Sequence, residues 1–219
     1  MSEAITGYGD RMRVSVAGGT RFSVDGRTST QINNGVSARL SPDLVDGDLI
    51  LAPHVGFAYS RVEAKRRKEV WIDLAGRHDG WGGPEEYSYF VDVERAKANR
   101  FTPSVGFSAG WLSEERHGED FFGALGAQAM VEVRRDFLGD YEIEQYPDRT
   151  VAVDGKDAKS WGLRAGGELL LEPYRFGEKG NGSGLGILVG AYWVMDTNPV
   201  TREGGKDSVE ASIGLLWTF

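Results

Sequence analysis

The sequence lacks cysteine, and it lacks any apolar run long enough for a membrane-spanning helix. Without cysteine there is no disulfide framework and no thiolate metal site. A membrane helix needs roughly 20 consecutive apolar residues, so a helical crossing is excluded. Residues 1–10 also lack the basic and apolar regions of a secretion signal, and we expect that such a signal was removed to give this mature chain.

Basic residues are outnumbered, with 25 Lys+Arg against 33 Asp+Glu and a net charge of −8. That balance gives no general attraction to nucleic acid, and we expect neither a nucleic-acid partner nor a cofactor. Glycine is abundant, with 31 residues among 219, about twice the usual ~7%. No collagen-like period accompanies it, so its role must be local.

Apolar residues recur at every second position in segments of about ten residues, which predicts β-strands. The eight segments are residues 12–24, 31–40, 49–60, 101–111, 121–134, 161–172, 185–193 and 209–219. Pro53 and Pro103 fall inside two of them and cannot donate a ladder hydrogen bond. We therefore expect a bulge or an uncertain register there.

The connections between these segments fall into two classes. Residues 41–48, 113–119 and 173–183 are compact, whereas residues 61–100 and 136–160 are long. In transmembrane barrels, short turns face the periplasm and long loops face the cell exterior. The sequence predicts an eight-stranded antiparallel up-and-down transmembrane β-barrel with long extracellular loops, spanning 1–219 as one domain, with residues 1–10 as a periplasmic N-terminal segment.

Two features indicate that the apolar face points outwards, to lipid. The opposite face is rich in Gly, Ser and Ala, which suits the narrow interior of an eight-stranded barrel. Aromatic residues gather near the segment ends, as in the two aromatic girdles of such barrels. The predicted girdle residues are Phe22, Tyr59, Phe101, Trp161 and Trp193 at the outer interface and Trp111, Phe121 and Trp217 at the inner one.

The chain ends on a strand that carries Ser212, Gly214, Trp217 and Phe219. This polar–glycine–hydrophobic–aromatic pattern resembles the last strand of outer-membrane proteins, and the whole layout resembles the small OmpA-transmembrane-domain and OmpX-like barrels. The resemblance implies a bacterial outer-membrane location, contact with outer-membrane lipid, and recognition of the last strand by the barrel-assembly machinery. We also expect a monomer.

Charged residues of both signs occupy the face predicted to line the lumen. They are Arg13, Arg21, Arg39, Arg134 and Arg164 against Glu132, Glu168, Glu172 and Glu210. Shut away from water, such charges must pair, which predicts an ion-paired plug; a polar pore is the alternative. Pairing Val133 with Leu163 would set Glu132 opposite Arg164 and Gln128 opposite Glu168.

Candidate catalytic and metal-binding groups are sparse. His54 is predicted to face the lumen with Ser108 opposite, but no acid is evident to orient it, so we predict no catalytic residue. His78 with Asp79, and the acidic group Asp136, Asp140, Glu142 and Glu144, match no metal-binding spacing. We therefore predict no metal site.

Alternation continues through the longest connection, which predicts that residues 61–100 extend above the membrane as an extracellular β-ribbon. Its basic run, Lys65, Arg66, Arg67 and Lys68, is a candidate contact for lipopolysaccharide phosphates. Its aromatic residues, Trp71, Trp81, Tyr87 and Tyr89, suit partner recognition. A structural or surface-interaction role through the loops is our leading interpretation; a narrow solute channel and a lipid-modifying enzyme are the alternatives.

Overall fold

The chain folds into an all-β structure of ten strands in a computed structural model. The structure describes residues 11–23, 28–46, 49–73, 86–116, 122–155, 160–176, 183–196, 199–200 and 206–219. The strands are β1 (Arg11–Ser23), β2 (Thr28–Asp46), β3 (Leu49–Asp73), β4 (Glu86–Arg116), β5 (Phe122–Leu138), β6 (Tyr141–Gln145), β7 (Arg149–Val153), β8 (Ser160–Phe176), β9 (Ser183–Asp196) and β10 (Lys206–Thr218). Within these ranges, no helix has the length and apolarity to cross a membrane.

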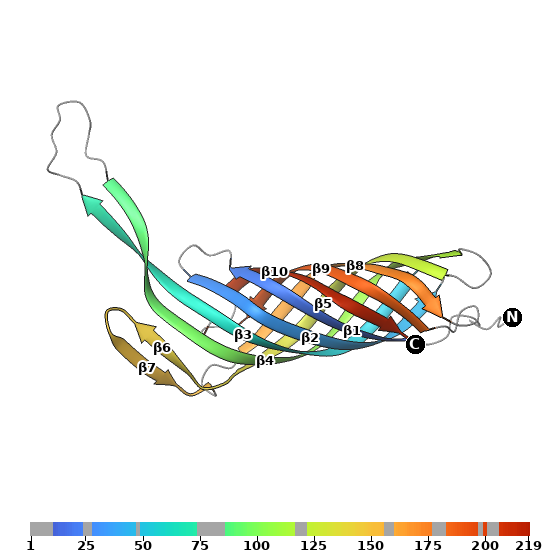
Figure 1. The fold of residues 1–219 in the computed structure, drawn as a ribbon, viewed down its shortest axis with the longest axis horizontal. Coiled ribbons are helices and arrows are strands. Elements are labelled where there is room, and N and C mark those ends of the chain that lie inside the picture. The colour runs from blue at the N-terminus through green and yellow to red at the C-terminus, as the bar shows by residue number, and fades with distance from the viewer. Residues whose placement is uncertain are drawn as a thin grey trace, which may run out of the picture.

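Eight of the strands close into an antiparallel ring in the order β1, β2, β3, β4, β5, β8, β9, β10. Strands β1 and β10 seal the ring through reciprocal backbone hydrogen bonds between Met12 and Phe219, at 2.9 and 3.0 Å. The predicted eight-stranded barrel is confirmed. The start of β1 and the end of β10 lie at one end of the barrel, together with the ends of β2, β4 and β8 (Figure 1).

Several strands are longer than the sequence predicts. Strand β2 continues to Asp46, β4 to Arg116 and β8 to Phe176, so residues predicted to be connections extend the ladders instead. At the other end, β3 and β4 keep pairing as far as Asp73 opposite Glu86. We call residues 61–73 and 86–100 the ribbon; it bends away from the barrel beyond its long-loop end (Figure 1).

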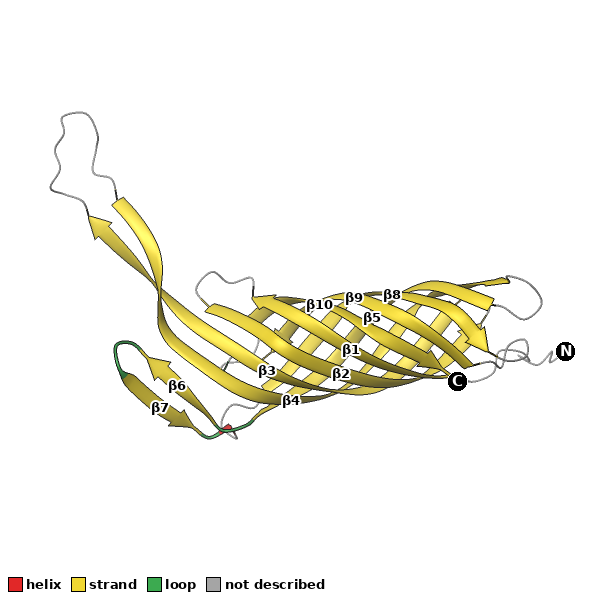
Figure 2. Cartoon of the chain, in the orientation of Figure 1, coloured by secondary structure: helices red, strands yellow, loops and turns green. Residues whose placement is uncertain are grey.

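A second extension was not predicted. Residues 136–160, expected to be a loop, contain the β6–β7 hairpin, and β6 pairs with Glu94–Lys97 of β4. The hairpin lies alongside the ribbon and turns at residues 146–148 (Figure 2). The alternation of Tyr141 and Ile143 with Glu142 and Glu144 is a strand pattern, but it is only five residues long.

The barrel has its apolar face outside. Predicted lipid-facing residues such as Val55, Val105 and Leu215 are exposed, while their strand neighbours His54, Ser104 and Leu216 are buried or half-buried. Tyr59, Phe101, Trp161 and Trp193 are exposed towards the long-loop end and Trp111 and Trp217 towards the other. Phe121 and the side chain of Phe22 lie outside the described residues.

The two strand prolines do not shift the register. Pro53 pairs with Phe107 and Pro103 with Phe57 in an unbroken β3–β4 ladder. Pairing is interrupted beside Pro103 on β5 and beside Pro53 on β2, yet it resumes in the same register on either side. Register shifts occur elsewhere in the ladders, one of them between Leu171 and Tyr174. The expected irregularity at Pro53 and Pro103 is therefore limited to missing ladder bonds.

The sealed lumen and the extracellular ribbon

The periplasmic part of the lumen is filled by an apolar layer. Its members are Ile50, Ala52, Leu112, Leu170, Leu188 and Leu216, all nearly inaccessible to solvent. Neighbouring strands supply glycine where these side chains need room, as where Leu112 lies opposite Gly126. No such layer was predicted, because the inward face reads as small and polar. It closes this end of the lumen to water.

Above that layer lies a network of buried charges. Val133 pairs with Leu163, which is the register proposed from the sequence, and Arg164 Nη1 lies 3.2 Å from Glu132 Oε2. The other terminal nitrogen of Arg164 lies 2.7 Å from Glu210. The guanidinium also stacks over the Tyr192 ring, with its carbon 3.5 Å from the ring centroid. Arg164 thus joins two carboxylates and an aromatic ring across the lumen.

Two further arginines lie close to the Glu210 carboxylate. Arg21 Nη2 approaches it to 2.6 Å, and Arg134 Nη1 lies 3.9 Å away. Arg21 and Glu210 are direct register partners across the β1–β10 seam. This carboxylate therefore sits between cations from β1, β5 and β8.

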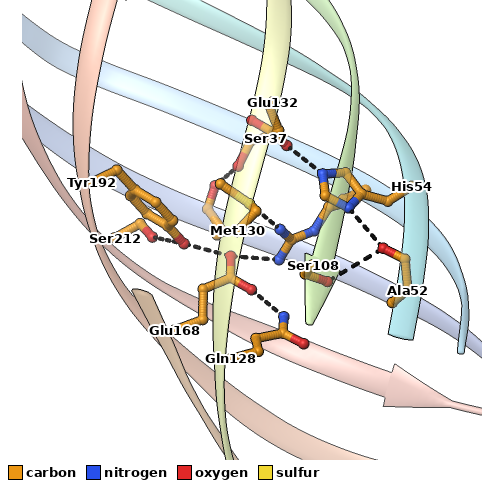
Figure 3. A network of polar contacts seen from close by, with 12 residues as sticks. Ser37, Ala52, His54, Ser108, Gln128, Met130, Glu132, Glu168, Tyr192 and Ser212 are labelled. Atoms are coloured by element: carbon orange, nitrogen blue, oxygen red, sulfur yellow. Dashed lines mark hydrogen bonds and ion pairs between the residues drawn. The ribbon is translucent and has the colours of Figure 1, made fainter. Parts of the chain in front are cut away.

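A second carboxylate, Glu168, organises the lower half of the network (Figure 3). It accepts hydrogen bonds from Arg39 at 2.7 Å and from the Tyr192 hydroxyl at 2.6 Å. The Gln128 amide also donates to it, across the pairing of Gln128 with Glu168 that the sequence suggested. Four strands are cross-linked through this one side chain.

The remaining predicted lumen charges are also buried, with local partners. Arg13 lies 2.9 Å from Asp43 and donates to Gln128, and Glu172 accepts from Thr218. Sequence reasoning missed three buried charges: Asp43, Arg100 and Asp136. Asp136 accepts from Thr102 at 2.7 Å and faces Arg100 at 4.0 Å. All three lie at or beyond the ends of the segments recognised in the sequence.

A carboxylate that the sequence did not reveal lies beside His54. Its Nε2 lies 3.2 Å from Glu132, and its Nδ1 lies 3.3 Å from the Ala52 carbonyl, to which only a ring N–H can donate. Ser108 is opposite Ala52 rather than His54, and its hydroxyl donates to that same carbonyl (Figure 3). The histidine therefore bridges two strands and makes no nucleophile–base pair with Ser108.

A second apolar cluster lies between the ribbon and the hairpin. Ala64, Ala96 and Ala98 on the inner face of the ribbon are buried against Tyr141, Ile143 and Val153 of the hairpin, and Val200 and Leu138 complete the cluster. The Tyr141 hydroxyl donates to the Pro199 carbonyl at 2.6 Å. The hairpin thus packs against the ribbon, and residues 199–200 join the same contact.

The ribbon is held together by cross-strand ion pairs. Lys65 and Arg67 both reach Asp92, at 3.3 and 3.1 Å, and Arg66 reaches Glu94 at 2.9 Å. Glu63 faces Arg95 at 2.6 Å. Three of the four residues in the basic run are therefore partly neutralised by carboxylates, whereas exposed Lys68 makes no ion pair with any described residue.

The carboxyl of Asp92 gives the ribbon a pH dependence. Partial burial alone would raise its pKa, but hydrogen bonds from Arg67 and Lys65 outweigh that effect and hold the pKa below its ordinary value. Because the pKa is lower in the folded chain, Asp92 stabilises the ribbon above about pH 4, the usual range of an aspartate. That contribution is lost as the pH falls through the depressed value.

We expect an NMR titration of the Asp92 carboxyl carbon to show a midpoint below that of an unstructured aspartate. Arg67→Met should raise the midpoint towards the ordinary value, since it removes a donor and a charge. The control is Lys97→Met, which removes a cation from β4, the strand that carries Asp92, at a position away from Asp92. An ordinary midpoint in the unaltered chain would contradict the ion-pair geometry.

Aromatic side chains are exposed towards the tip of the ribbon. Trp71, Tyr89 and Phe90 are 60%, 48% and 49% exposed. Trp71 and Tyr89 were predicted for this surface, whereas Phe90 was not. Trp81 and the side chain of Tyr87 lie outside the described residues, as do His78 and Asp79. Among the described residues, 67–73 and 86–92 of the ribbon pair with each other and with no third strand.

The C-terminal pattern residues lie on both faces of β10. Trp217 and Phe219 are exposed and their rings meet edge to face at 5.9 Å, while Ser212 is buried in the lumen and contacts the Tyr192 hydroxyl. Gly214 pairs with Ala17, whose Cβ would lie 2.6 Å from a Cβ at Gly214. The terminal aromatics therefore face outwards and the small residues inwards.

The acidic residues considered for a cation are dispersed. Asp136 is engaged in the lumen, Asp140 accepts from the Gly155 amide, and Glu142 and Glu144 are exposed on β6. Across the described ranges, no group of three or more His, Asp or Glu side chains is arranged to hold a metal ion.

No protein-family model matches this sequence, and no curated protein matches it. Among solved structures it is similar to Ail, the attachment invasion locus protein of Yersinia pestis, in complex with the heparin analogue sucrose octasulfate. That match has a TM-score of 0.43 and 8% identity, over 96% of this chain and 99% of Ail. Neisserial surface protein A gives a TM-score of 0.35 and 14% identity, over 94% of both chains.

The class of protein follows from the barrel itself. Its strands satisfy one another's backbone groups in a closed ring, its outer belt is apolar between aromatic girdles, and its charges are paired inside. In a membrane, such closure leaves no strand edge facing lipid. The chain is an eight-stranded transmembrane β-barrel of the bacterial outer-membrane type.

Proposed function

We propose that this chain is a surface-interaction protein, in which the barrel is a closed membrane anchor and the ribbon presents a recognition surface outside the cell. The observation that carries the proposal is the exposed aromatic group at the ribbon tip, Trp71, Tyr89 and Phe90. Aromatic side chains are enriched in the cores of protein interfaces. By the register of the ribbon, Trp71 and Phe90 lie on one face and Tyr89 on the other. Exposed on both faces of a narrow ribbon, these side chains favour a partner over a purely solvated surface.

The closed lumen favours this function over a channel. A conducting path would have to cross the apolar layer around Leu170 and Leu188 and the paired charges above it. Eight strands leave an interior that side chains can fill. Planar-bilayer recordings should therefore show no steady ohmic conductance; a stable open level would make the channel the better interpretation.

The ribbon aromatics can be tested without disturbing the barrel. We expect the triple replacement Trp71→Ser, Tyr89→Ser, Phe90→Ser to abolish attachment of expressing cells to host-cell monolayers and to one another. Heat-modifiable gel migration, which reports the folded barrel, should be unchanged because these side chains touch no lumen residue.

A matched control alters exposed polar positions on the hairpin, Arg149→Ser with Thr150→Ala, and should retain attachment. If the triple variant attaches as well as the parent while folding normally, the ribbon tip is not the recognition surface. If neither protein promotes attachment over empty cells, a purely structural role in the envelope replaces the proposal.

Lipopolysaccharide is a second partner that we propose for the same ribbon, now limited to one residue. Lys65, Arg66 and Arg67 are engaged with Asp92 and Glu94, so their charge is largely balanced locally. Lys68 is exposed and makes no ion pair within the described ranges. An ammonium group of this kind suits a phosphate as a point charge.

The last strand supports a further proposal, that Phe219 acts as part of an assembly signal. Removing Phe219 should reduce the folded protein recovered from outer membranes several-fold, yet leave refolding into detergent nearly unchanged. The exposed ring contributes at most roughly 1.5–3 kcal/mol to stability even if lipid buries it fully. Gel-shift quantification of membranes and of refolded protein tests this; equal losses in both would mean a stability effect only.

A further inference from the structure

Arg134 is a buried cation with poor local compensation. The residue is 5% exposed, and its nearest carboxylate is Glu210, 3.9 Å from Nη1. That distance is beyond hydrogen-bonding range, and Nη1 has no hydrogen-bond partner in the part of the chain that the structure describes. A buried guanidinium normally requires both a counter-charge and hydrogen bonds.

The charges around Arg134 do not supply what it lacks. Glu210 is already approached to 2.6 Å by Arg21 and to 2.7 Å by Arg164. Arg21 and Arg164 also repel Arg134, against attraction from Glu210 and the more distant Asp136. Arg100, on the neighbouring strand, adds to this repulsion. Arg134 is thus surrounded more closely by cations than by carboxylates that are free to serve it.

A cavity of about 60 Å³ lies inside the barrel at this level. Arg21, Arg100, Arg134 and Arg164 line it, together with hydroxyls that include Ser104 and Thr102. Glu132, Glu168 and Glu210 also reach its wall, but Arg164, Arg39 and Arg21 engage them. One water needs roughly 10–15 Å³ by this measure, so the cavity has room for a small ion with a few waters and for nothing as large as a sugar or nucleotide.

We propose that this lumen cavity binds a small inorganic anion, such as a halide, with Arg134 as its principal ligand. Water alone can accept the unused hydrogen bonds, but it cannot neutralise the charge. An anion does both, and at this depth it meets little competition from solvent screening. The site is independent of the ribbon and of the recognition role proposed for it.

Bromide is a suitable probe, because it can be located by anomalous scattering. The full chain is refolded into detergent in sodium bromide or, at equal ionic strength, in the sodium salt of a bulky organic anion that exceeds the cavity. The urea midpoint should rise with the logarithm of the bromide concentration once that concentration exceeds the dissociation constant. At a bromide concentration about 100 times the dissociation constant, the folded-to-unfolded ratio should be about 100-fold higher than without bromide.

Arg134→Met should lose this dependence, while Arg13→Met, which removes a lumen arginine outside the cavity, should keep it. Crystals of the unaltered protein grown in bromide should show an anomalous peak beside Arg134, which decides the matter even if the variant does not fold. An empty or water-filled cavity in those crystals overturns the proposal. So does an equal bromide effect in the parent and in Arg134→Met, since that would be a general salt effect.

Discussion

Replacing Arg164 with methionine is expected to lower the free energy of unfolding by about 3–5 kcal/mol, the usual effect of removing one partner from a buried ion pair. The loss leaves Glu132 with no arginine within 4 Å among the described residues and takes the cation at 2.7 Å from Glu210. Glu132→Gln alone should cost less, because Arg164 keeps Glu210. Urea unfolding in detergent, followed by tryptophan fluorescence, measures both.

The double replacement Glu132→Gln, Arg164→Met should recover part of the loss, because Glu210 retains Arg21 and the orphaned Glu132 charge is gone. Lys97→Met is the control: its exposed ammonium lies 3.9 Å from half-buried Glu63, and pairs at the surface contribute about 0–1 kcal/mol. Small, strictly additive effects of the two lumen replacements would indicate a water-filled lumen rather than a packed plug.

A valine at Gly110 is expected to destabilise the barrel by about 3 kcal/mol, at the upper end of the usual cost of overpacking. Gly110 faces the lumen opposite Gln128, and an added Cβ would lie 2.5 Å from the Cα of Gln128. A main-chain atom cannot swing aside as the end of a side chain can, so strands β4 and β5 would have to separate. The same unfolding measurement applies.

Gly167→Val provides the matched control on β8. Gly167 is exposed on the outer face, and the nearest atom to its added Cβ would be 3.9 Å away. Valine there should be neutral or slightly stabilising, since glycine has the larger backbone entropy to lose. Similar losses at both positions would mean that glycine is needed for strand conformation rather than for room in the lumen.

The alternation of side chains along each strand was enough to predict the barrel, its outer face and one interior pairing. Val133 and Leu163 lie on strands joined by a single connection, so matching their patterns set Glu132 opposite Arg164. The period of two leaves little freedom in the register of the two strands, because a slip of one residue would turn a lipid-facing valine into the lumen.

Contacts across the lumen could not be predicted in this way. His54 and Glu132 belong to strands that do not pair with one another. Both lie opposite Gly106 of β4, and their side chains meet over that glycine at 3.2 Å. The apolar layer was missed for a related reason. Leu170, Leu188 and Leu216 each stand among small or polar inward residues on their own strands, and they form a layer only when the strands are set side by side.

The β6–β7 hairpin marks a different limit. Its alternation of Tyr141 and Ile143 with acidic residues is genuine but short, and it stands among charged residues that resemble a solvated loop. What stabilises the hairpin is not local: Tyr141 and Ile143 pack on alanines of the ribbon about 40 to 80 residues earlier in the chain.

The contact between Arg21 and Glu210 joins residues 189 positions apart, on the first and last strands of the ring. Contacts of such long range form late, because most of the chain must already be in place. Until β10 arrives, Arg21, Arg134 and Arg164 lack the carboxylate between them, and the unfinished sheet has two open edges. An incomplete chain is therefore penalised twice in the membrane, by uncompensated charge and by unpaired backbone. Arrival of the last strand removes both penalties in a single step, so insertion and completion of the chain are coupled.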